Sequence, residues 1–234
     1  MYDVSSFVTL TYDDAHLPTT LIYSHFQKFM YRLRKRLGPT RFFMCGEYGD
    51  QNLRPHFHAL LFGQGFPDRR PCGANLYRSP TLESLWTAGF SSVGDVTFQS
   101  AGYVARYSLK KVTGSRAGAH YSAVDVRTGE VVYREPEFGH MSLKPGIGFG
   151  WFQKYWRDVF AVRDGVVAPG GRLVPPPKYY FKLLESIDPD RVEELELERY
   201  VNAGHFAEDC TPARLVTREL CQLAKERSRA QRCL

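Results

Sequence analysis

The chain has 234 residues, of which 43% are hydrophobic, and 31 Lys and Arg against 25 Asp and Glu give a formal net charge of +6. This composition supports a buried core and favours an acidic partner such as nucleic acid. The five cysteines form no Cys-x-x-Cys, which excludes a zinc knuckle or an obvious disulfide framework. Because no secretion signal and no apolar run near the ~20 residues of a membrane span are present, we expect a cytoplasmic protein without membrane contact.

Residues 5–12 (SSFVTLTY) are β-branched and aromatic, which predicts a strand. A helix should follow, capped by Thr19 or Thr20 and stopped by Gly38-Pro39. Its apolar stripe falls at i, i+4, i+7 and i+11, namely Phe26, Met30, Leu33 and Leu37. Two strands, 41–48 and 55–63, then flank the turn residues GDQNLR, so a hairpin is expected.

The next segments repeat the pattern of helix and strand. We expect a short helix over 80–89 that Gly89 ends, a strand over 93–98, and a helix over 101–111. Ser100 could cap this last helix and Gly114 could end it. The order β-α-β-β-α-β-α predicts an α+β fold of the split βαβ, ferredoxin-like type, in which helices flank an antiparallel sheet.

Signals are weaker beyond residue 112. A small hairpin over 123–133 turning at Thr128-Gly129, a helix over 150–160, and helices near 178–203 and 212–231 are expected. APGGRLVPPP is typical of a linker. The predicted domains are therefore a main domain at 1–160, a Pro/Gly-rich linker at 161–177 and a C-terminal helical extension at 178–234.

His56-Phe57-His58 is the first pattern that could carry chemistry. Residues two apart on a strand point to the same face, so both imidazoles should project together. Glu47, near the end of the partner strand, is the natural third metal ligand, and Asp50 in the turn is an alternative. Two nitrogens and one carboxylate with open positions are typical of a catalytic metal site. Hydrogen-bonded surface histidines are the competing interpretation.

Tyr103, Tyr107 and Lys110 form the second pattern. On a helix, i, i+4 and i+7 lie on one face, so the two phenols should be neighbours. A tyrosine is a poor nucleophile at neutral pH because its pKa is about 10, and a nearby cation favours the phenolate. Arg106 and Lys111 add positive charge to the same helix. Core aromatics at helical spacing are the alternative, but so many cations are costly to bury.

A third pattern is the run of basic residues at the end of the first helix, which includes Arg32, Lys35 and Arg36. Basic side chains on one helix can contact a phosphate backbone. A solvated helix face explains the same residues equally well.

Together these motifs resemble a known family. RPHFHALLF is similar to the metal motif of HUH endonucleases, FVTLTY resembles the first strand motif of that superfamily, and YVARYSLKK resembles its tyrosine helix in the two-tyrosine version. With EFGHMSLKPGIGFGWFQKYW, residues 5–160 look most like the replication initiators of Microviridae, particularly the gokushovirus branch. The residues after 160 match no pattern that we can name.

The resemblance implies roles for individual residues. His56, His58 and Glu47 would bind a divalent metal, Mn²⁺ or Mg²⁺, and Tyr103 and Tyr107 would be paired nucleophiles assisted by Lys110. Arg106 and Lys111, like the basic residues of the first helix, would contact DNA. The implied activity is rolling-circle replication, in which origin single-stranded DNA is nicked and held as a 5′-phosphotyrosine.

The resemblance also implies partners and leaves alternatives. Because the sequence has no G-x-x-x-x-G-K-[ST] motif, a host helicase and a host polymerase are expected partners. A plasmid initiator, a transposase, a relaxase, and a non-catalytic DNA-binding regulator remain alternatives. Relaxases carry their tyrosine before the histidines, and transposases usually have one tyrosine, so the order here disfavours both.

Overall fold

The computed structural model describes residues 2–49, 52–107, 111–125, 128–161 and 164–231, without the side chains of Tyr107 and 229–231. The chain divides into two compact units, Met1–Phe149 and Gly150–Leu234. The domain boundaries expected at 160 and 177 stay a prediction. Among the described residues, no helix has the length and apolar character needed to cross a membrane.

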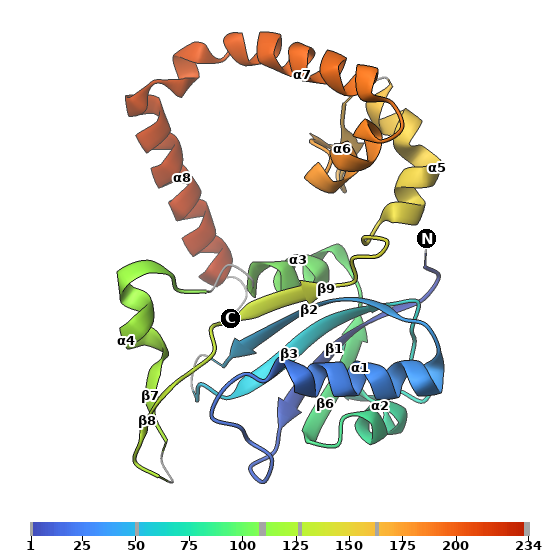
Figure 1. The fold of residues 1–234 in the computed structure, drawn as a ribbon, viewed down its shortest axis with the longest axis vertical. Helices are drawn as coiled ribbons and strands as arrows, with labels where there is room; N and C mark the ends of the chain where they lie inside the picture. The colour runs from blue at the N-terminus through green and yellow to red at the C-terminus, as the bar shows by residue number, and fades with distance from the viewer. Residues whose placement is uncertain (1, 50–51, 108–110, 126–127, 162–163, 232–234) are drawn as a thin grey trace. The chain divides into compact units, whose positions relative to one another are not determined.

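The first unit is built on a seven-stranded antiparallel sheet in the order β4-β5-β6-β1-β3-β2-β9 (Figure 1). Every pair of neighbouring strands in it is antiparallel. The strands are β1 (Ser5–Tyr12), β2 (Arg41–Tyr48), β3 (Pro55–Phe62), β4 (Arg70–Gly73), β5 (Leu76–Arg78), β6 (Gly89–Asp95) and β9 (Phe138–Met141). This arrangement confirms the predicted α+β class and the hairpin of β2 and β3.

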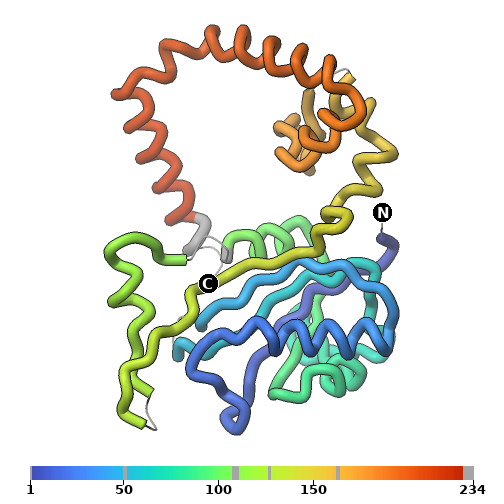
Figure 2. Tube along the Cα trace, viewed as in Figure 1, coloured from blue at the N-terminus to red at the C-terminus, as the bar shows by residue number. Residues whose placement is uncertain are grey.

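Helices lie on both sides of this sheet (Figure 1). Further along the chain, two short strands form a separate small hairpin, and the chain then returns to the sheet edge as β9 (Figure 2). The elements of this part are α1 (Tyr23–Leu37), α2 (Pro80–Leu85), α3 (Phe98–Tyr107), η1 (Gly114–Arg116), α4 (Ala117–Tyr121), β7 (Ser122–Val124) and β8 (Val131–Tyr133). β7 and β8 confirm the hairpin predicted over 123–133.

The main core lies between the sheet and α1 with α2. The apolar stripe of α1 packs there against inward side chains of β1, β2 and β3, and the rings contact one another edge to face or tilted. Its fully buried large side chains include Tyr12, Phe26, Phe29, Phe57 and Trp86. Aromatic packing of this kind contributes to stability beyond simple area burial. This side of the sheet also holds more buried apolar side chains than the opposite side.

A smaller cluster lies on the opposite side of the sheet, under α3. Buried Cys45, Leu60 and Val104 form its centre, and the partly buried side chains of Phe7 and Tyr103 pack against them. Because side chains alternate along a strand, the residues of β2 and β3 whose side chains point away from the main core are the ones that face α3. Helix α3 therefore covers the sheet face that carries the predicted metal ligands.

Some predicted element ends are wrong. Helix α1 begins at Tyr23 rather than after Thr19 or Thr20, because the hydroxyl of Thr20 bonds instead to the Tyr48 hydroxyl and the Glu135 amide. Helix α2 ends at Leu85, because the indole of the next residue, Trp86, is buried and donates to the Thr11 carbonyl oxygen.

The positions of Gly89 and Ser100 also differ from prediction. Gly89 opens β6 at φ +148°, where an added Cβ would lie 2.2 Å from the Asp13 backbone nitrogen, so the site requires glycine. Helix α3 begins at Phe98, and Ser100 lies inside it, where its hydroxyl accepts from the Thr97 amide. Gly114 belongs to η1, after the undescribed residues 108–110.

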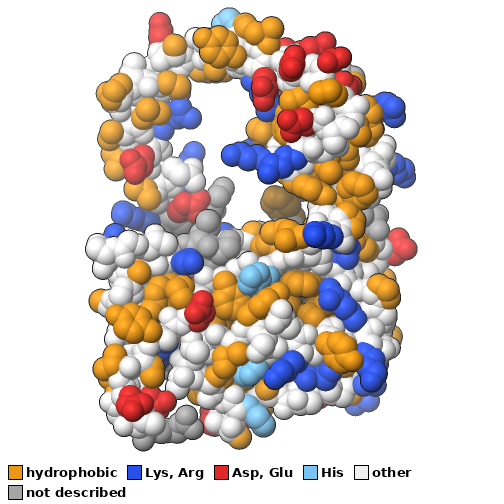
Figure 3. Space-filling view, viewed as in Figure 1, with side chains coloured by type: hydrophobic (Ala, Val, Ile, Leu, Met, Phe, Trp, Pro, Cys, Tyr) orange, Lys and Arg blue, Asp and Glu red, His pale blue; other side chains and the backbone are white. Residues whose placement is uncertain are grey.

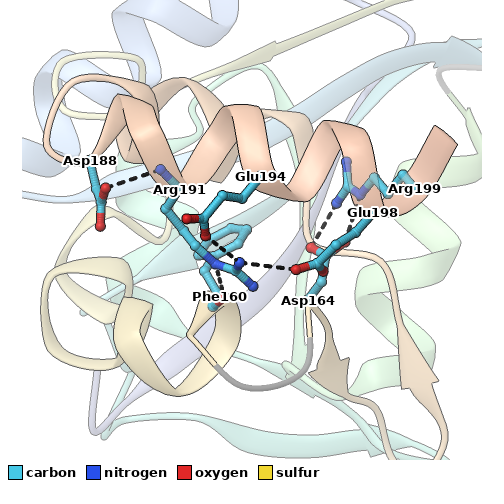
Figure 4. A network of polar contacts seen from close by, with 7 residues as sticks. All are labelled: Phe160, Asp164, Asp188, Arg191, Glu194, Glu198 and Arg199. Atoms are coloured by element: carbon cyan, nitrogen blue, oxygen red, sulfur yellow. Dashed lines mark hydrogen bonds and ion pairs between the residues drawn. The ribbon is translucent and has the colours of Figure 1, made fainter. Parts of the chain in front are cut away.

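The second unit is helical and centres on a cluster that includes Phe152, Phe160, Leu184 and Leu195. An ionic network on α7 supports it: Arg191 donates to the Phe160 carbonyl oxygen and pairs with acidic side chains of its own helix (Figure 4). The elements are α5 (Phe149–Phe160), β10 (Val166–Val167), β11 (Leu173–Val174), α6 (Lys178–Glu185), α7 (Pro189–Gly204), η2 (Ala207–Cys210) and α8 (Pro212–Gln231). The predicted helices are confirmed, with a break between α6 and α7.

Candidate metal centre

The β2–β3 hairpin brings the predicted metal ligands together. Its register pairs Glu47 with His56 and Cys45 with His58, without a bulge between them. Glu47, His56 and His58 therefore project from adjacent strands to one face, while Phe57 between the histidines points into the main core. The structure confirms the predicted alternation of side chains along this strand.

The three side chains converge closely enough to share one cation. One ligand atom from each lies within 4.8 Å of the others. Nε2 of His56 lies 2.7 Å from Glu47 Oε1, and Nε2 of His58 lies 3.1 Å from the same oxygen. Glu47 and His58 are buried, and His56 is partly exposed at the surface. The group can hold a metal ion, and the partly exposed His56 lies at its surface side.

The far nitrogens of both imidazoles are also engaged. His56 Nδ1 lies 3.0 Å from the carbonyl oxygen of Arg54, which can only accept, so this nitrogen carries a proton. His58 Nδ1 lies 2.9 Å from the hydroxyl of Thr9. Such partners fix ring orientation in metal sites and leave Nε2 as the ligand. The donor set and its supports therefore fit a divalent cation.

Electrostatics in the group favour the ionised carboxylate. Burial raises the pKa of Glu47, but the hydrogen bonds and positive charge of His56 and His58 outweigh it and hold that pKa below its usual range. A carboxylate that stays ionised beside two imidazoles suits a divalent cation.

Tyr103 lies beside the histidines. The centre of its ring is 5.4 Å from that of His58 and 6.2 Å from that of Phe7, both edge to face. Phe7 in turn stacks on His58 at 5.6 Å. Helix α3 thus carries this phenol to the same sheet face as the metal group, and Tyr103 is only partly buried.

The structure describes the other predicted residues of this segment only in part. Tyr107 follows Tyr103 by one turn at the end of α3, but its side chain lies outside the described residues. Lys110 and Asp50 lie outside them altogether. Arg106 is exposed in the last turn of α3, and Lys111 is exposed just beyond.

The basic residues of α1 are not brought to this site. Helix α1 packs on the opposite side of the sheet, with the main core between it and the histidines. Arg32 donates to the Leu85 carbonyl oxygen, and Arg36 donates to the Ser84 hydroxyl. Both therefore tie α1 to α2, while Lys35 is exposed. Any DNA contact that these residues make is remote from the metal group.

Thr9 and Phe7 contact the site, although the sequence patterns do not single them out. Both lie on β1, whose register places Thr9 opposite His58. The pattern of the motif FVTLTY that contains them predicts a strand but gives neither residue a role at the site. Its alternation could place Phe7, Thr9 and Thr11 on one face, but it does not reveal the pairing partner of β1.

Comparisons with known proteins agree with these motifs. Residues 5–112 match the family model of the Replication-associated protein ORF2 type. The chain is 32% identical over 224 residues to replication-associated protein VP4 of Bdellovibrio phage phiMH2K, covering 89% of this chain and 66% of that protein. It is 28% identical over 197 residues to replication-associated protein ORF2 of Spiroplasma virus 4, covering 76% and 57%.

A further relative is replication-associated protein ORF4 of Chlamydia phage 1, which is 33% identical over 125 residues and covers 47% of this chain and 31% of that protein. The chain thus spans at most about two thirds of these relatives. No solved structure matches it significantly. On the matched motifs and relatives, the chain belongs to the Replication-associated protein ORF2 family of small single-stranded DNA phages.

Proposed function

We propose that this protein is a replication-initiation endonuclease that nicks single-stranded origin DNA and holds the cut 5′ end on a tyrosine. The observation that carries the proposal is the 5.4 Å between the ring centres of Tyr103 and His58. A nucleophile must lie close to the metal that binds the same phosphate. One phosphodiester over this sheet face can contact both groups.

His56, His58 and Glu47 would hold a divalent cation, and two nitrogens with one carboxylate suit Mn²⁺ somewhat better than Mg²⁺. When bound, the ion would polarise a non-bridging oxygen of the scissile phosphate. The Thr9 hydroxyl and the Arg54 carbonyl oxygen orient the two imidazoles. Helix α3 packs over part of the site and carries the partly buried Tyr103 there.

The reaction conserves the phosphodiester. The phenol oxygen of one tyrosine attacks phosphorus and loses its proton, a new O–P bond forms, and the bond from phosphorus to the 3′ oxygen breaks. The 3′ oxygen takes a proton and leaves as a hydroxyl that can prime synthesis. The reverse reaction re-joins the strand without a nucleotide. A second tyrosine one turn along, Tyr107, would cut the regenerated junction and allow circle closure.

The fold supports the same interpretation. β1 and β2 are joined through α1 and are separated in the sheet by β3. This split βαβ order supports the ferredoxin-like, HUH endonuclease fold that we propose. We propose that origin single-stranded DNA is the substrate and that a host helicase and polymerase act with the protein in the bacterial cytoplasm. Arg106, Lys110 and Lys111 would contact the DNA backbone near the nick.

Two other functions make different predictions. A plasmid-type or transposon-type nickase would share the chemistry and differ in the origin that it cuts. A non-catalytic origin-binding regulator would bind DNA without forming a covalent product. The proximity of Tyr103 to the metal group favours an enzyme over a regulator, because binding alone gives no reason for a phenol beside His58.

The test is incubation of the protein with labelled single-stranded origin oligonucleotides and Mn²⁺, followed by denaturing electrophoresis. We expect a covalent adduct that Tyr103→Phe plus Tyr107→Phe abolishes, while DNA binding persists. Tyr31→Phe, at a 69% exposed tyrosine on α1, is the matched control and should keep the adduct. An adduct in the double variant would defeat the tyrosine mechanism, and nicking in excess EDTA would defeat the metal site.

A further inference from the structure

A hollow lies at the start of β2, at the end of the strand remote from Glu47. It has a volume of about 570 Å³ and is open to solvent at the surface. Three cationic side chains, Arg34, Arg41 and Lys144, line it together with uncharged residues. We call it the basic pocket. No acidic side chain is among the described residues that line it.

The cations of the basic pocket are not neutralised by carboxylates. Arg34 donates through Nε and Nη2 to the Thr40 carbonyl oxygen and lies over the Phe42 ring. Lys144 is exposed, and within the described chain neither it nor Arg41 forms an ion pair. Arginines elsewhere do pair with carboxylates, as in Arg54–Asp14, Arg69–Asp95, Arg78–Glu83, Arg199–Asp164 and Arg214–Asp209. The basic pocket therefore holds three cations without a carboxylate partner among the described residues.

Arg41 adds a sharper observation. Its Nη2 atom is buried, yet no hydrogen-bond acceptor lies within reach of it in the described structure. Guanidinium groups that lose water usually gain an anion or a carbonyl partner, because an unpartnered buried donor is costly. The guanidinium of Arg41, which lines the basic pocket, therefore has unused donor capacity, and three cations without a carboxylate partner suit a phosphate group.

Arg41 links the basic pocket to the strand face of the metal group. Arg41 and Glu47 are six residues apart on β2, and the regular pairing with β3 keeps both on one face. Six residues of strand span roughly 20 Å. The exposed side chain of Leu143 also lines the pocket and offers an apolar contact beside the cations. Figure 3 shows Lys and Arg side chains interspersed with apolar ones on the side of this unit that carries α1.

We propose that the basic pocket binds the phosphodiester backbone of single-stranded DNA, on the same strand that enters the metal site and several nucleotides away from the nick. The proposal rests on the proposed function. It would give the nuclease a second point of attachment, through Arg41 and Lys144, that positions the strand without reading its bases. Arg34 supports the pocket wall through its bonds to Thr40.

The test measures binding rather than cleavage. The parent is the Tyr103→Phe plus Tyr107→Phe protein in EDTA, so nicking cannot contribute. Fluorescence anisotropy with an oligothymidylate of about 16 nucleotides, a length that spans a typical single-strand site, gives the affinity at several salt concentrations. Lys144→Ala is added to this parent, with Lys28→Ala, an exposed lysine on α1, as the matched control.

We expect Lys144→Ala to reduce the slope of log affinity against log salt by about 0.7, the value for one lost phosphate contact on a single strand. A fourfold rise in salt would then weaken the variant roughly 2.6-fold less than the parent. Arg41→Ala plus Lys144→Ala should reduce the slope by about 1.4. Lys28→Ala should leave it unchanged. Equal slopes for Lys144→Ala and the parent, or equal losses for Lys144→Ala and Lys28→Ala, would overturn the proposal.

A second arm separates DNA from a free anion. Inorganic phosphate is titrated against the DNA complex at constant ionic strength. If phosphate displaces DNA from the parent but not from Lys144→Ala, and the variant also has the reduced salt slope, the result supports a backbone site. Phosphate binding that depends on Lys144 with an unchanged DNA slope would show a free-anion site and overturn the DNA proposal. Because no arm requires nicking, failure of the nuclease proposal is detected separately.

Discussion

The two faces of the central sheet differ in what they bury. Toward α1 and α2, strands β1, β2 and β3 present aromatic and aliphatic side chains such as Phe57 and Leu61. Toward α3 the same strands present Glu47, His56 and His58. Phe57 and His58 are neighbours in sequence and yet belong to different environments. Because side chains alternate along a strand, one strand can supply the core with one set of residues and the site with the other.

This difference implies that stability and site chemistry can be changed separately. Substitutions on the α1 face should act on the free energy of unfolding, and substitutions on the α3 face should act on cation binding. Phe57 and His58 give the most direct comparison, because they lie next to each other on β3.

The largest effect is expected from Phe57→Ala. The ring is fully buried and contacts Tyr12, Phe26 and Trp86 edge to face or tilted. Its removal should lower the free energy of unfolding by about 3–5 kcal/mol, as large-to-small changes in cores do. Urea denaturation measures this loss, and Phe57→Leu should recover most of it. A loss below about 1 kcal/mol would contradict the assignment of Phe57 to the main core.

An intermediate effect is expected from His58→Ala. The parent should gain about 2.7 kcal/mol of stability when Mn²⁺ is present at 100 times its dissociation constant. The variant should lose this gain, because one of three ligands is gone. Thermal unfolding with and without Mn²⁺ measures it. His16→Ala, at an exposed histidine that is not one of the three ligands, should retain the gain. Stabilisation that survives in His58→Ala would place the metal elsewhere.

The smallest effect concerns Asp68, which supports the start of α2. Partial desolvation raises the pKa of Asp68, but hydrogen bonds from the Ser79 hydroxyl and the Thr81 amide outweigh it, so the pKa lies below the usual range. A lowered pKa adds stability above the unfolded-state value, and this stability is lost as pH falls through the folded-state value.

Asp68→Asn should therefore be less stable than the parent at pH 7 and should lose less stability on acidification. Urea denaturation at pH 7 and near pH 3 measures both changes. Equal acid sensitivity in the two proteins would show that Asp68 does not contribute to the pH dependence.

The sequence predicts the central strands of the sheet and helix α1 well, and the strands at or near the sheet edges poorly. β1, α1, β2 and β3 have strong local periodicity, so their type and most of their bounds could be predicted. β9 could not, because Phe138–Met141 is surrounded by Gly and Pro and is a strand only through pairing with β2 far earlier in the chain. The short exposed strands β4 and β5 have the same weakness.

The candidate site shows the same limit. The convergence of Glu47, His56 and His58 could be predicted, because a hairpin and strand alternation are local properties. The contact of Thr9 with His58 could not, because it needs the pairing of β1 with β3. The roles of Arg32 and Arg36 depend on where α2 packs, and their bonds to Leu85 and Ser84 could not be seen in the sequence.

The alternation of β3 also restricts how this hairpin can vary in length. A single-residue insertion between Phe57 and His58 would exchange the faces of every later residue in the strand and move Leu61 out of the core. The turn between Tyr48 and Pro55 has no such constraint, since loop insertions cost little. Relatives of this protein should therefore differ in the length of that turn and keep the strand on either side of it free of odd-numbered insertions and deletions.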